Sequence, residues 1–305
     1  MEVMTKGKKI RNIILLFLTA LIWGMAFVAQ SVSMDYIQPL TFICIRFFIG
    51  GLFLLPFIFI MDKKKKEDMQ QIEKTEPNKK TLLAGGIICG IFLFGGSFFQ
   101  QVGIQYTTVG KAGFLTAFYI IIVPLLGLFL KKKCPPLTWC GVALSLVGLY
   151  FLCMTESLTL QKGDALVFIG AFMFAGQIMA IDYYNPMVDG VRLSCIQFFT
   201  AGIIGFIGMI LFEQPQLSAI LGAAGPILYT GIMSSGVGYT LQIIGQKGIH
   251  PAVAALILSL ESVFSALSGF LFLHQGMSGR ELLGCGLMFL AIILAQMPDF
   301  REKRY

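Results

Sequence analysis

The stretch NIILLFLTALIWGMAFVAQSV, residues 12–32, carries no charged side chain from end to end. A helix needs about 20 apolar residues to cross the hydrocarbon core of a bilayer, so this stretch predicts a membrane-spanning helix. It follows a basic segment at residues 6–11, as a secretion signal would. However, the apolar region of such a signal is about 7 to 15 residues long and ends in an A-x-A-like cleavage site, which is missing here. We therefore expect an uncleaved first span.

The composition of the whole chain shows the same membrane pattern. Of its 305 residues, 56% are apolar and 13% are charged, and the mean hydropathy is +0.81. A soluble protein of this length would carry charge over its whole surface, whereas here Lys and Arg gather in short clusters between apolar runs. The net charge of +7 therefore indicates membrane orientation and no nucleic-acid partner, because such a partner needs a soluble basic face. The expected surrounding is the lipid bilayer.

Charged and turn residues divide the chain into ten apolar runs, which predict an all-α integral membrane fold with ten transmembrane helices. The eighth run is overlong and contains Gly225-Pro226 and Ser234-Ser235-Gly236, so we expect it to be kinked or partly unwound. The predicted spans are residues 12–32, 38–60, 81–102, 107–130, 136–153, 163–183, 191–212, 218–244, 251–273 and 279–297.

An even number of spans places both termini on one side, and the distribution of Lys and Arg identifies that side as the cytoplasm. Only Lys111, Lys162 and Arg280 fall on the outer side, and Arg46 lies within a span. All other Lys and Arg residues lie on the inner side. The inner loop of residues 61–80 is charged and has almost no apolar content, so it predicts a mobile cytoplasmic linker with no domain of its own.

The two halves of the chain resemble each other. A shift of 151 residues places Trp23-Gly24 on Phe174-Ala175, and a shift of 143 residues aligns the later spans. Each half holds five predicted spans, an odd number, so the second half is expected to enter the membrane upside down relative to the first. The sequence thus predicts two inverted five-helix repeats, residues 1–153 and 154–305.

Several motifs are spread along nearly the whole chain: Trp23-Gly24 with Phe27, Pro39 with Arg46, Gln105-Tyr-Thr-Thr, Phe114-Leu-Thr-Ala-Phe-Tyr with Pro124, and Leu258-Ser-Leu-Glu261-Ser-Val-Phe. Together they resemble those of one family, the EamA-type carriers of the drug/metabolite transporter superfamily. The sequence departs from that pattern at Ser262, where a Pro commonly follows the Glu, and at His274-Gln275, where a Gly-Glu pair is common. The resemblance implies a ten-helix carrier with a central cavity, often a metabolite exporter, and no bound cofactor.

Two ionisable side chains stand within predicted spans, and such residues are rarely idle in a membrane. Glu261 lies mid-span, and Ser265 shares its helical face at the i, i+4 spacing. The carboxylate could face a cavity and bind a cation or couple transport to a proton, or it could pair with Arg46 and hold two helices together. Arg46 could equally satisfy neighbouring carbonyls or bind a substrate carboxylate or phosphate, and Gln197 is its counterpart in the repeat.

The remaining candidates are uncharged polar and aromatic residues inside apolar runs. Trp23 is unusual because tryptophan normally marks the membrane interfaces, yet this one lies mid-span. Buried amides and hydroxyls must find hydrogen-bond partners, and either a substrate or a neighbouring helix could supply them. These substrate-binding candidates are Trp23, Gln101, Tyr119, Gln177, Gln197 and Tyr239.

The sequence predicts a secondary transporter that moves a small organic metabolite, such as an amino acid or a related amphipathic solute, by alternating access. No GxxxxGK[ST] phosphate loop is present, so we expect no ATP hydrolysis, and neither a catalytic residue nor a metal site is predicted. The alternatives are a membrane-embedded enzyme acting on a lipid-linked substrate and a membrane sensor or channel. We expect a monomer or homodimer in a plasma membrane of bacterial type, working as an exporter.

Overall fold

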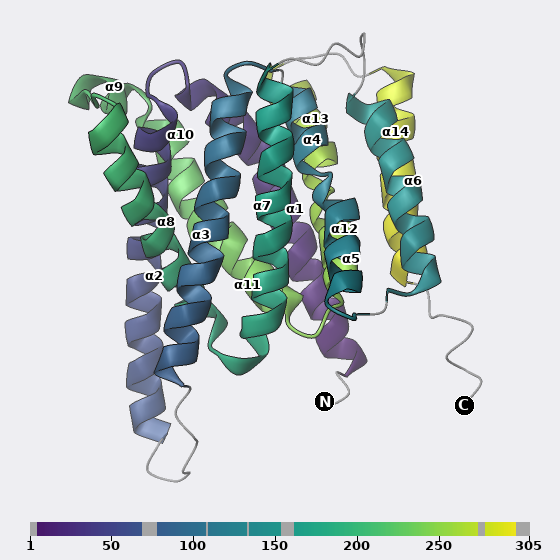
Figure 1. The fold of residues 1–305 in the computed structure, drawn as a ribbon, viewed down its shortest axis with the longest axis horizontal. Helices are drawn as coiled ribbons and strands as arrows, with labels where there is room; N and C mark the ends of the chain where they lie inside the picture. The colour runs from purple at the N-terminus through teal and green to yellow at the C-terminus, as the bar shows by residue number, and fades with distance from the viewer. Residues whose placement is uncertain are drawn as a thin grey trace.

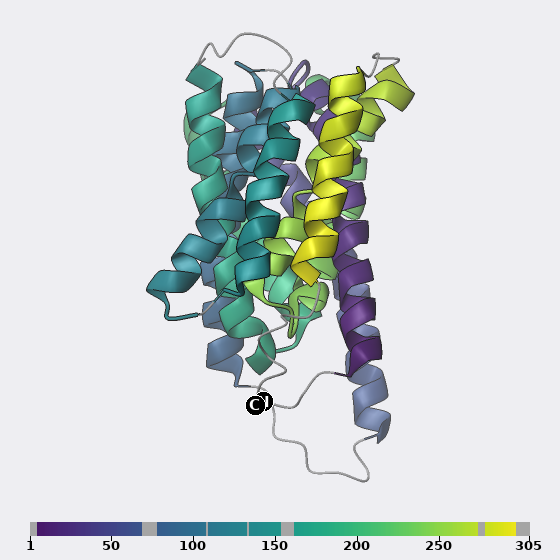
Figure 2. The same cartoon turned by 90° about the vertical axis from the view of Figure 1, so that its right-hand side faces the viewer.

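The computed structural model describes residues 5–68, 78–107, 109–132, 134–153, 162–273 and 278–296. Within these ranges every regular element is helical, and no strand is present. The helices lie side by side in one bundle (Figures 1 and 2). Residues 69–77 of the predicted inner loop, the His274-Gln275 pair and the C-terminal basic residues 301–304 lie outside the described residues.

The all-helical membrane fold predicted from the sequence is confirmed. Seven helical stretches of the described chain are long and apolar enough to cross a membrane, and α6 adds a shorter apolar helix. The first half contains α1 (Lys6–Ser33), α2 (Pro39–Asp68), α3 (Lys79–Ile104), α4 (Val109–Thr116), α5 (Tyr119–Phe129) and α6 (Pro136–Cys153).

The second half repeats this plan with one irregular element. The segment predicted to be kinked or unwound is broken at Ala223 and then winds as a π-helix over Tyr229–Tyr239. The elements are α7 (Lys162–Tyr184), a 3₁₀ turn (Asn185–Met187), α8 (Gly190–Phe212), α9 (Leu217–Gly222), α10 (Ala224–Leu228), the π-helix (Tyr229–Tyr239), α11 (Thr240–Gln246), α12 (Pro251–Leu258), α13 (Glu261–Leu273) and α14 (Gly279–Gln296).

One predicted boundary is wrong, because the charged loop expected to begin at residue 61 begins later. Helix α2 continues to Asp68, so residues 61–68 are helical. Lys, Glu and Met are good helix formers, and extending an existing helix requires no new nucleation. On this extension Asp62 forms an ion pair with Arg192 at the start of α8. The polar composition of the segment therefore marks the end of the apolar run but not the end of the helix.

Helix starts are fixed by residues that satisfy the unpaired N–H groups of the first turn. Asp189 accepts a hydrogen bond from the Arg192 backbone N–H at 2.9 Å at the start of α8. Helix α2 begins at Pro39, and its first turn is capped from another helix: Glu213, just after α8, accepts from the N–H groups of Leu40 and Thr41, both at 2.7 Å. The start of α2 is thereby bound to the end of α8.

The packing of the helices is symmetric between the halves. Helix α2 packs against α8 and α6 against α14, while α3 packs against α7 and α1 against the π-helix and α11. Exchanging each helix for its counterpart in the other half returns the same set of pairs. Helix α1 begins at the end of the bundle where N is marked, whereas α7 begins at the opposite end (Figure 1). Corresponding helices thus run in opposite directions.

The α6–α14 contact depends on glycines that let the two backbones meet. A Cβ added to Gly284 would lie 2.6 Å from both the Gly148 carbonyl oxygen and the Leu152 backbone nitrogen. No real Cβ approaches backbone atoms so closely, and the backbone cannot rotate away as a side chain could. A Cβ added to Gly286, one half-turn further along α14, meets nothing within 4 Å.

We therefore expect Gly284→Ala to lower the melting temperature of the detergent-purified protein, because the added methyl group pushes α14 away from α6. Gly286→Ala is the matched control, and it should keep or raise the melting temperature because alanine favours a helix interior over glycine. Thermal unfolding followed by tryptophan fluorescence measures both. Equal melting temperatures for the two variants would contradict the close α6–α14 contact.

Candidate substrate-binding cavity

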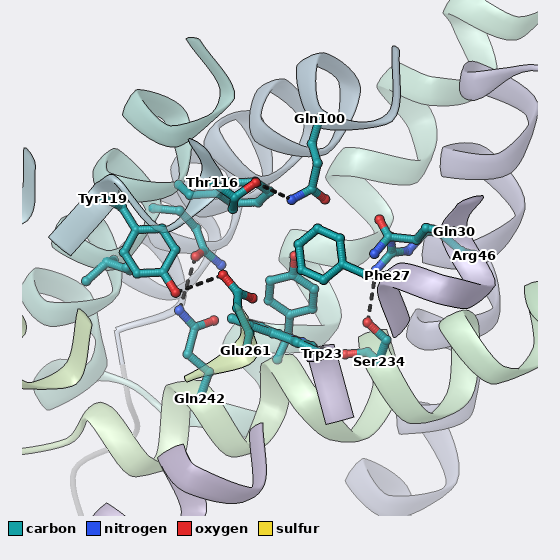
Figure 3. A pocket seen from close by; sticks show the side chains of 14 residues that line it. Trp23, Phe27, Gln30, Arg46, Gln100, Thr116, Tyr119, Ser234, Gln242 and Glu261 are labelled. Carbon is teal, nitrogen blue, oxygen red and sulfur yellow. Dashed lines mark hydrogen bonds between the residues drawn. The ribbon is translucent and has the colours of Figure 1, made fainter. Parts of the chain in front are cut away.

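A polar cavity lies in the middle of the bundle, where segments from both halves meet. Its free volume is about 30 Å³, which holds one or two water molecules but is far below the roughly 300 Å³ of a typical small-molecule pocket. Figure 3 shows the side chains that surround it. They are Trp23, Phe27, Gln30, Arg46, Gln100, Thr116, Tyr119, Phe174, Gln177, Ile178, Ser234, Tyr239, Gln242 and Glu261.

Arg46 forms the positive side of the cavity. It is 2% exposed, and its guanidinium donates to neutral oxygens only: Ser235 Oγ at 3.3 Å, Gln30 Oε1 at 3.3 Å and Ser234 Oγ at 3.2 Å. Its charge also lies 5.0 Å from the centre of the Phe47 ring. In the described part of the chain no acidic side chain forms an ion pair with it, so its positive charge is solvated by dipoles and an aromatic face alone.

The serines that hold Arg46 belong to the π-helix. A π-helix is wider than an α-helix, and such segments are frequent at functional sites. Here side chains of neighbouring helices bond to its carbonyls, since Trp23 Nε1 donates to the Ser234 oxygen at 3.3 Å. In return Tyr229 of the π-helix donates to the Ile22 oxygen of α1 at 3.1 Å. The irregular winding is thus fixed by α1 and presents Ser234 and Ser235 to the guanidinium.

Glu261 forms the negative side. It is 4% exposed and accepts a hydrogen bond from the Tyr119 hydroxyl at 2.9 Å. Each of these two residues is the first of a helix, Glu261 of α13 and Tyr119 of α5. A helix start carries partial positive charge, which favours a carboxylate at that position.

Both helices begin at a break in a longer run. Residues 117–118 separate α4 from α5, and residues 259–260 separate α12 from α13, at corresponding places in the two halves. At each break the backbone tightens to i→i+3 hydrogen bonds, for example from the Leu260 N–H to the Ile257 oxygen at 3.2 Å. Ser262 Oγ donates to the Gly113 oxygen of α4 at 3.0 Å, so the two broken helices are bonded to each other. Discontinuous helices of this kind build the binding sites of many transporters.

Glu261 and Arg46 do not form an ion pair with each other, although both line the same cavity. Figure 3 shows them on opposite sides, with Phe27 between them. Trp23 and Tyr239 add an aromatic wall, since their rings lie 4.5 Å apart. The cavity is therefore bipolar, with an acidic side chain on one side, a basic side chain on the other and aromatic surface between.

Of the nine candidates predicted from the sequence, six line the cavity and three do not. Glu261, Trp23, Arg46, Tyr119, Gln177 and Tyr239 line the cavity. Gln101 lies outside it and donates to the Gln30 backbone oxygen at 3.1 Å, Gln197 lies behind Gln177, and Ser265 is buried without reaching the lining.

Eight lining residues are not among the nine candidates predicted from the sequence: Phe27, Gln30, Gln100, Thr116, Phe174, Ile178, Ser234 and Gln242. Thr116 accepts a hydrogen bond from Gln100 Nε2 at 2.9 Å, which explains how that amide is held. The internal repeat could have identified Phe174, because this residue is the counterpart of Trp23 and both line the cavity. Isoleucine and threonine in an apolar run carry no such signal.

Comparison with known proteins agrees with this geometry. Residues 10–154 and again residues 161–297 match the EamA-like transporter family. The chain belongs to this family. It is therefore a multi-pass membrane protein of a transporter family, and the resemblance seen in its sequence motifs is confirmed.

Similar proteins extend along nearly the whole chain. An uncharacterized transporter of Archaeoglobus fulgidus is 30% identical over 92% of this chain and 84% of its own length. The uncharacterized transporter YoaV of Bacillus subtilis is 23% identical over 93% of this chain and 96% of its own length. A solved crystal structure shares the fold, with a TM-score of 0.73 at 17% identity over 96% of this chain and 99% of that one.

The Tyr119–Glu261 hydrogen bond gives a prediction about stability. We expect Tyr119→Phe to lower the free energy of unfolding by about 1 kcal/mol, because it removes one buried hydrogen bond between helices at almost constant volume. Unfolding in detergent and a double-mutant cycle with Glu261→Gln would measure the coupling of the two side chains. Tyr150→Phe, on the exposed face of α6, is the matched control and should change little. A coupling energy of zero would show that the bond is not formed.

Proposed function

We propose that this chain is a secondary transporter that carries a small organic metabolite, such as an amino acid or a related amphipathic solute, across the plasma membrane of a bacterial-type cell. Membership of the EamA-like transporter family supports transport in general. The observation that carries the specific proposal is the bipolar cavity in the middle of the bundle. Buried charges of opposite sign that do not neutralise each other are costly in a membrane interior, and a solute that brings complementary groups would compensate both.

The small size of the cavity and the symmetry of the packing support alternating access as the mechanism. A free volume of about 30 Å³ admits water but no metabolite, so the helices must separate for a solute to enter. Because the helix pairs are equivalent under exchange of the halves, a movement that opens one side has a counterpart that opens the other. We propose that the halves, residues 1–153 and 154–305, rock about the cavity in this way, with net export as the physiological direction.

We further propose ten spans with both termini in the cytoplasm. The α4–α5 and α12–α13 pairs each supply one interrupted span, and α9, α10, the π-helix and α11 together supply another. Helix α1 begins and α14 ends at the same end of the bundle (Figures 1 and 2). The basic residues that precede and follow these helices belong on the inner side by the positive-inside rule.

This orientation predicts the behaviour of fusion proteins. Green fluorescent protein attached after Tyr305 should fluoresce, and alkaline phosphatase attached there should be inactive, because the first folds in the cytoplasm and the second only after export. A fusion of alkaline phosphatase after Gly279, at the opposite end of α14, is the internal control and should be active. An active phosphatase at the C-terminus would reverse the orientation.

The transport proposal is tested by counterflow of labelled amino acids and related metabolites in proteoliposomes. We expect saturable exchange of at least one solute, and we expect Glu261→Gln to reduce it at least tenfold because the anionic side of the cavity is lost. Glu281→Gln is the matched control, since Glu281 accepts hydrogen bonds from Ser278 at the start of α14 and does not line the cavity. An imposed pH gradient should drive uptake in the parent protein and not in Glu261→Gln if Glu261 carries the coupling proton.

Two results would count against the proposal. If the folded protein exchanges no solute of the panel, the result favours the enzyme and sensor alternatives over a transporter. If Glu261→Gln and Glu281→Gln transport equally well with and without the pH gradient, Glu261 has a structural role. Retention of exchange together with loss of pH-driven uptake in Glu261→Gln would separate substrate binding from proton coupling.

A further inference from the structure

A chain of three buried amides leads from the cavity toward α8. Gln242 Nε2 donates to Gln177 Oε1 at 3.2 Å, and Gln177 Nε2 donates to Gln197 Oε1 at 3.3 Å. The three residues come from α11, α7 and α8, and each is at most 1% exposed. Gln242 and Gln177 line the cavity, whereas Gln197 lies behind them.

The direction of this chain determines which group reaches the cavity. The middle amide uses its nitrogen toward one neighbour and its oxygen toward the other, so the chain runs head to tail. Its two end groups, Gln242 Oε1 and Gln197 Nε2, have no hydrogen-bond partner among the described residues. The unpaired acceptor therefore lies on the residue that lines the cavity, and the unpaired donor lies at the far end.

An amide oxygen buried without a partner is destabilising, and a ligand that donates a hydrogen bond to it would recover that cost. Figure 3 shows the Gln242 amide on the same side of the cavity as the Glu261 carboxylate and opposite Arg46. Glu261 accepts only from Tyr119 within the described chain. This side of the cavity thus offers two hydrogen-bond acceptors, and a ligand group with at least two N–H donors would satisfy both.

We propose that Gln242 determines substrate specificity, and that its Oε1 accepts a hydrogen bond from a primary ammonium group of the solute whose charge Glu261 compensates. Gln177 and Gln197 are positioning residues, because they hold the Gln242 nitrogen and so turn its oxygen toward the solute. The inference rests on the proposed transport function and narrows it to solutes with a primary ammonium group. Secondary, tertiary and quaternary amines offer fewer N–H donors and should bind progressively more weakly.

Binding can be measured apart from transport, because the chain has two tryptophans and one of them, Trp23, lines the cavity. In a Trp139→Phe background the fluorescence reports from Trp23 alone. The probes are the common amino acids and the corresponding decarboxylated primary amines, followed by the N-methyl, N,N-dimethyl and N,N,N-trimethyl derivatives of the tightest binder and its deaminated acid. We expect a primary ammonium compound to bind best and the trimethyl derivative to bind at least tenfold more weakly.

The assignment to Gln242 is tested by a matched pair of substitutions. Gln242→Leu should weaken binding of the primary ammonium probe about tenfold and abolish its advantage over the trimethyl derivative. Gln246→Leu makes the same change one turn further along α11, outside the cavity lining, where the amide nitrogen donates to the Ile178 backbone oxygen at 3.2 Å, and it should leave that advantage unchanged. The ratio of the two affinities separates recognition from a general loss of folding. Should Gln242→Leu not fold, Gln177→Met should reduce the same ratio, because the Gln242 amide is then free to turn.

Each of the opposite results overturns the inference. These are binding of no primary ammonium probe, equal binding of the methylated series in the parent protein, and an unchanged ratio in Gln242→Leu. Preference for the deaminated acid, lost in Gln242→Leu, would show that the chain runs in the reverse direction and presents a donor. Binding of primary ammonium probes without counterflow would contradict the transport proposal but support this inference. Counterflow of solutes that have no ammonium group would support transport and contradict this inference.

Discussion

Lipid offers no hydrogen bonds, and this single constraint decides both the secondary structure and the placement of polar side chains. Every backbone N–H and C=O in a span must be satisfied within the protein, which leaves helices as the regular element of the described chain. Polar side chains are subject to the same rule. Large apolar residues such as Phe59, Phe129 and Phe212 are therefore exposed on the outside, while glutamines, serines and the two mid-span charges lie inside.

The π-helix and the breaks before α5 and α13 lie beside the cavity and are compensated by side chains. The π-helix shares its carbonyls with α1, the break before α13 is bonded to α4 through Ser262, and the break before α5 places Tyr119 on Glu261. Irregular backbone at membrane depth is tolerated where it is buried in protein or lines a cavity. These three irregular segments thus share one feature, since polar side chains around the centre of the bundle supply partners for their backbone groups.

Apolar run length and charge clusters predicted where helical segments lie, because both follow from the thickness of the bilayer, but they did not predict the interruptions at residues 117–118 and 259–260. The overlong eighth run was identified as irregular from its Gly-Pro and Ser-Ser-Gly content, but a π-helix could not be predicted, since its winding depends on bonds to α1 more than 200 residues away. The end of α2 was missed for a related reason. The composition indicates where the apolar run facing lipid ends. Helix α2 continues beyond that run into water and ends at Asp68.

The site was less predictable than the fold, because membership of the cavity depends on rotation of each helix. Gln100 and Gln101 are adjacent in sequence, yet only Gln100 lines the cavity, while Gln101 bonds to the α1 backbone. Gln177 and Gln197 are bonded to each other, but only the nearer one reaches the wall. A single sequence identifies which residues are polar inside the membrane. It does not tell which of two neighbouring polar residues faces the centre.

The separation of Glu261 from Arg46 is the feature that connects the fold to transport. In a direct ion pair each side chain would compensate the charge of the other, so a solute with complementary groups would gain little by binding between them. In this structure the guanidinium is held by Gln30, Ser234 and Ser235, and the carboxylate by Tyr119, all of them neutral groups. Neutral partners fix the geometry of a buried charge but compensate it only in part. The rest of the compensation is left to water or to a solute that lies between the two side chains. The neutral partners belong to both halves of the chain, so whatever occupies the cavity acts on the contact between the halves.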